Sequence, residues 1–151
     1  MNSIAITAAL IAFVLLNGAL AKAAVATNAT KYYVQLIRTS DSTNAPQAGA
    51  RLVGPKLADK FHAVFKGKTY WETKCQEVLV APGHPVKVSL TSHRDIEIGV
   101  TDANRTITLF YDGQAVNRII AARGEGMSVI GDTSKKEPTC FVVVRRDKPA
   151  P

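Results

Sequence analysis

The feature that most constrains the fold is a series of short apolar–polar alternations, separated by turn residues, in the second half of the chain. Val86, Val88 and Leu90 alternate with polar side chains, and the same pattern recurs at residues 96–100. Alternation with a period of two places apolar side chains on one face of a strand. The strands recur at the spacing of roughly 8–12 residues that is typical of an antiparallel sandwich or barrel. Asp112-Gly113 is the strongest hairpin signal, because both central positions of that turn need positive φ.

The whole pattern predicts a mainly β fold, an antiparallel sandwich or barrel of about seven to eight strands with one short helix, after an N-terminal signal peptide. The expected strands are 31–39, 69–81, 86–90, 96–100, 107–111, 114–122, a short strand around 127–129, and 140–146. The first has apolar residues at both odd and even positions, which indicates a strand that is central or covered on both faces.

One helix is expected between the first two strands. Pro55 suits the first helical position, where its missing N–H would be unpaired in any case. Apolar residues then recur at i, i+4, i+7 and i+8, namely Leu57, Phe61, Val64 and Phe65. We expect Gly67 to end the helix, and the helix to cover an open end of the fold or one sheet face.

The N-terminus carries an export signal. Residues 4–16 form an apolar stretch of 13, broken only by Thr7. This is shorter than the roughly 20 residues that a membrane-spanning helix needs, and it fits a signal peptide. Cleavage after Ala21, Ala23 or Ala26 is possible, and the alternative is an uncleaved anchor helix. We assign residues 1–23 to the signal peptide, 24–30 to a flexible lead-in, 31–146 to a single β-rich domain and 147–151 to a C-terminal tail.

Export also bears on the two cysteines, Cys75 and Cys140. In an oxidising compartment an even pair favours one disulfide, and the two residues lie on different expected strands. Two separate buried thiols are the alternative. A metal site is not expected, because the chain has no Cys-x-x-Cys and no His at suitable spacing.

The net charge of +7 favours anionic partners for an exported domain. Six cations flank the expected helix or end the last strand, and they form a candidate surface for an anionic partner: Lys56, Lys60, Lys66, Lys68, Arg145 and Arg146. The partner would be an unidentified protein or an anionic envelope polymer. Nucleic acid is not expected, and a membrane is expected only through an uncleaved signal segment. The alternative is a charge that serves solubility alone.

No motif predicts a reaction. Gly126 and Gly131 have the spacing of a phosphate-binding loop, but Asp132 replaces the lysine that such a loop needs. We therefore expect no enzyme activity and no cofactor. The alternative is a small hydrolase or a secreted hydrolase inhibitor. A hydrolase would need groups such as His93, Asp95, Glu125 and Ser128 to converge, and an inhibitor would present the loop at 40–51 or at 132–138.

Four segments carry a likeness to known proteins. They are Tyr33-Val34-Gln35-Leu36-Ile37-Arg38, Gly54-Pro55-Lys56-Leu57-Ala58, Tyr70-Trp71-Glu72 and Val142-Val143-Val144-Arg145-Arg146. Together they resemble a group of small exported bacterial β-rich proteins of unknown function. The resemblance implies a periplasmic or extracellular location and brings no activity and no site residue. The sequence thus predicts an exported, non-catalytic β-domain that binds a partner or belongs to the envelope.

Overall fold

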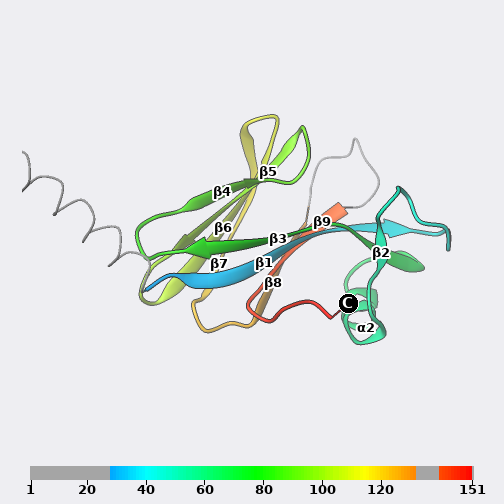
Figure 1. Ribbon diagram of the computed structural model, residues 1–151, viewed down its shortest axis with the longest axis horizontal. Coiled ribbons are helices and arrows are strands. Elements are labelled where there is room, and N and C mark those ends of the chain that lie inside the picture. Colours follow the sequence, from blue (N-terminus) through cyan, green and yellow to red (C-terminus); the bar gives the residue numbers. More distant parts are fainter. Residues whose placement is uncertain (1–27, 132–139, 151) are drawn as a thin grey trace, which may run out of the picture.

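A computed structural model describes residues 28–131 and 140–150. Nine strands in this part of the chain form two antiparallel sheets (Figure 1). The larger sheet has the order β2-β3-β1-β9-β8, and the smaller has the order β4-β5-β6-β7. The strands are β1 (Thr30–Ser40), β2 (Arg51–Leu52), β3 (Thr69–Val80), β4 (Val86–Ser89), β5 (Arg94–Val100), β6 (Asn104–Tyr111), β7 (Gln114–Ala122), β8 (Met127–Gly131) and β9 (Cys140–Arg145), and the helix is α2 (Pro55–His62).

The two sheets pack face to face, so the fold is a sandwich rather than a barrel. Every second residue of β5, including Ile96 and Ile98, is buried, as the alternating pattern predicts. These side chains meet Val34 of β1 and Val142 of β9 across the interior. The Asp112-Gly113 hairpin between β6 and β7 is also confirmed, since these residues have φ of 47° and 78°.

β1 is central in the larger sheet, because it pairs with β3 on one side and with β9 on the other. Its even-numbered residues, such as Val34, face the sandwich interior. Its odd-numbered residues, such as Gln35 and Ile37, lie on the outer face of the sheet and are buried as well. The expectation of a strand covered on both faces is therefore confirmed.

Helix α2 covers part of this outer face. Phe61 of the helix packs against Phe141 of β9, with 4.7 Å between the ring centroids, and against Tyr70 of β3. The helix begins at Pro55 as predicted, but it ends at His62 rather than at Gly67. Phe65 nevertheless reaches the sheet and stacks on Phe141, whereas Val64 is 74% exposed and does not belong to the apolar stripe. Its predicted burial is wrong because the helical period no longer holds after His62.

Several sequence predictions concern residues that the structure does not describe, and two others differ from it at the strand boundaries. The predicted signal peptide, residues 24–27 of the lead-in and the loop at 132–138 lie outside the described residues. β1 already includes Thr30, which was assigned to the lead-in. The two-residue strand β2 was not predicted from the sequence, and it has no alternation to reveal it. Among the described helices, none is long and apolar enough to span a bilayer.

The predicted disulfide between Cys75 and Cys140 is wrong. Cys75 of β3 lies opposite Gln35, and Cys140 of β9 lies opposite Arg38, so the whole of β1 separates the two cysteines. They also lie on opposite faces of the sheet, because positions 35 and 38 of an alternating strand point to opposite sides. Neighbouring strands are about 4.8 Å apart, and two intervals alone exceed the Cα separation of about 7 Å that a disulfide tolerates. The structure accordingly contains no bond between them.

Candidate functional site

A cleft of about 780 Å³ lies on the outer face of the larger sheet, beside α2. One wall comes from the segment that joins β2 to α2, and another comes from the C-terminal residues 147–150. These residues follow β9 and run back toward α2 (Figure 1). These two segments, distant in sequence, therefore line one cleft together with the outer face of the sheet.

The floor of the cleft is polar and buried. Gln35 of β1 and Glu72 of β3 are only 3% and 7% exposed. The Gln35 amide donates a hydrogen bond through Nε2 to Oε2 of Glu72. Arg51 of β2 donates from Nε, at 3.1 Å, and from Nη2 to the other carboxylate oxygen, Oε1. The charge of Glu72 is thus matched by Arg51, and the floor carries little net charge.

Some hydrogen-bonding capacity at the cleft is unused within the described part of the chain. Oε1 of Gln35 and Nε of Arg145 are buried atoms without a hydrogen-bond partner there. The first is an acceptor and the second is a donor, and both residues line the cleft. Most buried polar atoms in proteins are hydrogen-bonded, so the cleft differs in this respect from an ordinary structural hollow.

The cleft has an excess of positive charge. Five cationic residues and two acidic residues line it: Arg51, Lys56, Lys60, Arg145 and Lys148 against Glu72 and Asp147. Arg51 is engaged with Glu72. By contrast, the ion pairs formed among the described residues do not include Lys56, Lys60 or Arg145. The field in the cleft therefore favours an anion.

The walls of the cleft are mostly apolar. The apolar lining residues are Leu52, Val53, Pro55, Leu57, Met127, Pro149 and Ala150. Leu52 is 61% exposed, although it is a large aliphatic side chain. Val53, Leu57 and Met127 pack against the aromatic cluster around Phe141, which holds these walls in place.

The structure divides the predicted anionic-partner surface. Lys56, Lys60 and Arg145 meet at the cleft, as does Lys148 of the basic tail. Lys66 instead lines a separate hollow with Arg38 and Asp41. Arg146 lines another hollow with Lys31, and Lys68 is exposed away from the cleft.

Sequence reasoning missed the floor of the cleft. No motif in the sequence assigns a function to Gln35. Glu72 occurs only in the segment Tyr70-Trp71-Glu72 of the resemblance, which brings no site residue. The available signal was a polar residue within a strand that is apolar on both faces, because such a residue is buried and needs a partner.

Cys75 lies on the same outer face as Gln35, opposite it in the β1–β3 pairing. Burial raises the pKa of the Cys75 thiol, and the negative charge of Glu72 raises it further, while Arg51 and Arg145 act in the opposite direction. The net effect keeps the thiol protonated at neutral pH. Cys75 therefore lacks the lowered pKa of a reactive cysteine.

Two of the groups named for a hydrolase, His93 and Ser128, do not converge. Nδ1 of His93 lies 2.7 Å from Oδ1 of Asp112, and its ring stacks on Tyr111 at the end of β6. Ser128 is buried, and its hydroxyl accepts a hydrogen bond from Arg105 at the start of β6. Arg105 and Tyr111 are six positions apart along β6, which corresponds to a distance of about 20 Å. No cluster of three potential metal-binding side chains occurs in the described residues.

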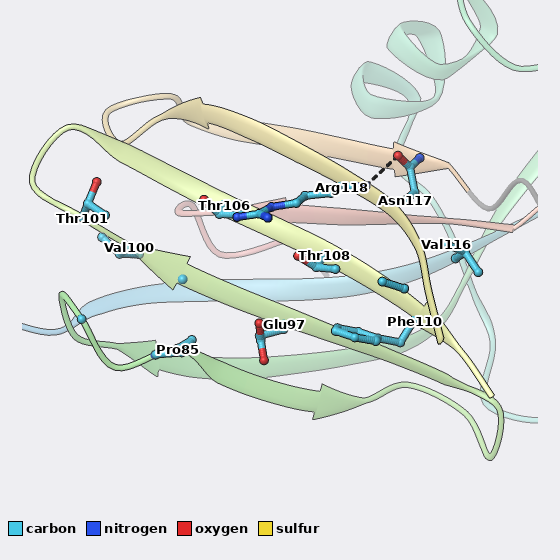
Figure 2. Close-up of a pocket in the computed structure, with 13 residues that line it drawn as sticks. Pro85, Glu97, Val100, Thr101, Thr106, Thr108, Phe110, Val116, Asn117 and Arg118 are labelled. Carbon is cyan, nitrogen blue, oxygen red and sulfur yellow. Dashed lines mark hydrogen bonds between the residues drawn. The ribbon is translucent and has the colours of Figure 1, made fainter. Parts of the chain in front are cut away.

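A second hollow, of about 690 Å³, lies on the outer face of the smaller sheet (Figure 2). Glu97, Thr108, Phe110 and Arg118 are among the residues that line it, and they come from β5, β6 and β7. Its Glu97 and Arg118 carry opposite charges, so no excess of one sign is concentrated there. None of the buried unpartnered atoms in the described chain belongs to its lining. The cleft beside α2 is therefore the better candidate.

Comparison of the chain with protein-family models, with curated proteins and with solved structures finds no match. The resemblance to small exported bacterial proteins accordingly stays an expectation, and the cleft is the feature of the described chain that indicates a function.

Proposed function

We propose that this protein is an exported, non-catalytic binding domain that takes up an anionic ligand in the cleft beside α2. The observation that carries the proposal is the set of cations, Lys56, Lys60 and Arg145, which converge on one concave site without carboxylate partners in the described chain. Like charges brought together repel one another, and an anionic ligand relieves this repulsion.

The binding would be mainly electrostatic at the mouth of the cleft. Lys56 and Lys60 are exposed on α2 and lie one helical turn apart, so both ammonium groups can approach the same anion. Arg145 supplies a planar guanidinium, which pairs well with carboxylate or phosphate. The Arg51–Glu72 pair below them is internally neutralised and does not compete for the ligand.

The test is a set of separate titrations of the ¹⁵N-labelled mature protein with succinate, inorganic phosphate and poly-L-glutamate. Each titration is monitored by NMR. We expect at least one of these anions to shift the amide signals of residues 52–54, 56–60 and 145–148. The double variant Lys56→Gln/Lys60→Gln should weaken binding about tenfold or more, since each lost charge contact is worth on the order of 1 kcal/mol. Added salt should weaken it as well.

The matched control is Lys66→Gln/Lys68→Gln. This variant removes the same charge from the neighbouring segment, whose side chains lie outside the cleft. It should bind almost as tightly as the unaltered protein. Equal losses in the two double variants, or no response of the cleft signals to any anion, would contradict the proposed function.

Export is tested separately by cell fractionation and by the mass of the mature chain. We expect a protein that lacks the signal segment and is found outside the cytosol. Recovery of the full-length chain from the cytosol would rule out an exported domain.

A further inference from the structure

The apolar walls of the cleft narrow the class of ligand. Leu52 is exposed at the mouth, and Val53, Leu57 and Met127 continue the apolar surface toward the sheet. A site for a simple inorganic anion or a fully polar polymer would gain nothing from such walls. An apolar body that covers them removes their surface from water, which is favourable in proportion to the area covered.

Apolar and cationic side chains adjoin one another around the cleft. Leu57 follows Lys56 on α2, and Met127 of β8 lies opposite Arg145 of β9. Pro149 similarly follows Lys148 in the C-terminal segment. Each wall thus offers a positive charge beside an apolar surface, which matches a ligand whose anionic group is attached directly to an apolar body.

The size of the cleft indicates a single small molecule. Its volume of about 780 Å³ lies within the range of roughly 300–1,000 Å³ that is usual for small-molecule sites. Such sites combine mostly apolar walls with a few placed polar groups, and the buried Gln35 and Glu72 are polar groups of this kind.

We infer that the ligand is a small amphipathic anion, namely an aliphatic chain that ends in a carboxylate or phosphate. This inference rests on the proposed function, because the cations must first select an anion. The aliphatic chain lies against the apolar walls, and the anionic group pairs with the cations of α2 and β9. The same chemistry occurs in free acids and in membrane lipids, and the cleft volume favours the free molecule.

The test is a calorimetric titration of the mature protein with butanoate, hexanoate, octanoate and decanoate at monomeric concentrations. Burial of each added methylene group should tighten binding by up to about fourfold until the cleft is filled. Octanol has the same chain without the charge, so it should bind more weakly than octanoate. Lys56→Gln/Lys60→Gln should abolish most of that difference.

Two leucines provide a matched pair of variants for the apolar part. Leu52→Ser should reduce the gain in affinity per methylene, because Leu52 lines the cleft. Leu79→Ser should leave the gain unchanged, since Leu79 is equally exposed, at 60%, but lies outside the cleft. Both side chains are exposed, so neither change should impair folding.

The outcomes separate the inference from the proposed function. Affinity that does not depend on chain length, together with loss of binding in Lys56→Gln/Lys60→Gln, would overturn the amphipathic ligand and keep the anion site. No binding of any acid or of phosphate would overturn both. Binding to vesicles rich in anionic lipid, with no binding of monomeric decanoate, would overturn the single-molecule ligand in favour of a membrane surface.

Discussion

Arg51, in a strand of two residues, lies directly opposite Glu72 of β3 and donates two hydrogen bonds to one oxygen of its buried carboxylate. Gln35, from the next strand, donates to the other oxygen. These hydrogen bonds compensate the buried charge of the Glu72 carboxylate, which would otherwise destabilise the fold. They also hold β2 against β3 at the edge of the sheet. This arrangement also places Leu52 and the start of α2 at the cleft.

Removal of Arg51 should therefore destabilise the fold. Arg51→Ala leaves the Glu72 carboxylate buried without its cation, and this should lower the midpoint of urea unfolding clearly. The matched control is Lys31→Ala, which breaks the pair between Lys31 and Glu77, 2.7 Å apart and about half exposed on both sides. That variant should change the midpoint little, because exposed ion pairs contribute little. Equal effects of the two changes would contradict the argument.

The exposed ion pair between Lys31 and Glu77 should still affect the measured pKa of Glu77. The hydrogen bond and charge of Lys31 hold the pKa of Glu77 below its usual value. A lowered carboxyl pKa stabilises the folded state above the pKa of the unfolded chain, and this contribution disappears as the pH falls through the lowered value. In NMR titrations, Lys31→Ala should move the Glu77 pKa back toward the usual value. An unchanged pKa would show that the two groups do not pair in solution.

Phe141 should be the most sensitive residue of the outer face. It is fully buried and contacts the rings of Phe61, Phe65 and Tyr70. Phe141→Ala should cost about 4 kcal/mol in the free energy of unfolding, as is usual for loss of a core aromatic ring. Val64→Ala, at a site that is 74% exposed, should change it by less than about 0.5 kcal/mol. A small effect at Phe141 would show that α2 does not pack on the sheet.

The cysteines should behave as two unlinked residues. The intact mass should show no loss of two hydrogens, and a reductant should not change the unfolding midpoint. A thiol reagent should label the exposed Cys75 in the folded protein and reach the buried Cys140 only after unfolding. Because the pKa of Cys75 is raised, labelling should accelerate only at a pH above the usual thiol range. Cys75→Ser should abolish native-state labelling, and continued labelling of that variant would contradict the assigned burial of Cys140.

The sandwich interior contains a guanidinium whose replacement should be tolerated. Arg105 is fully buried, donates to the Ser128 hydroxyl and lies over the ring of Tyr32, with its carbon centre 5.1 Å from the ring centroid. Its Nε and Nη1 have no partner among the described residues. Arg105→Met keeps most of the volume and removes the buried charge, so it should leave the free energy of unfolding unchanged or raise it.

A double-mutant cycle measures the interaction between Arg105 and Ser128. Ser128→Ala should cost about 2 kcal/mol when Arg105 is present, because the guanidinium then loses its hydroxyl acceptor. The same change in the Arg105→Met background should cost little. Strong destabilisation by Arg105→Met would instead show that Arg105 has a stabilising role beyond its bond to Ser128.

Local patterns were sufficient for the regular elements. The alternation through Ile96 and Ile98, the Asp112-Gly113 turn and Pro55 at the helix start each depend on neighbours within a few residues, and all are confirmed. The predictions failed where distant contacts decide the outcome. The helix ends at His62 rather than at Gly67, which leaves the predicted stripe residue Val64 exposed, whereas Phe65 still packs on Phe141 through a contact between distant segments.

The cleft was predicted only in part, for a related reason. Charge clustering in the sequence identified Lys56, Lys60 and Arg145, because cations that lie close together in the sequence can be recognised without knowledge of the fold. It grouped them with Lys66, Lys68 and Arg146, which lie elsewhere on the molecule. The cysteine count likewise favoured a disulfide that the strand order makes impossible.

The amino-acid sequence by itself determined the strands other than β2, the main hairpin, the start of the helix and the positive charge, since these follow from short-range periodicity and composition. Only the tertiary structure decided that β1 lies between β3 and β9, which separates the cysteines and brings Gln35, Glu72 and Arg145 onto one face. The order of strands in a sheet depends on pairing between segments far apart in the chain. Such pairing leaves no periodic signal in a single sequence, and the cleft with its buried polar floor is a product of that pairing.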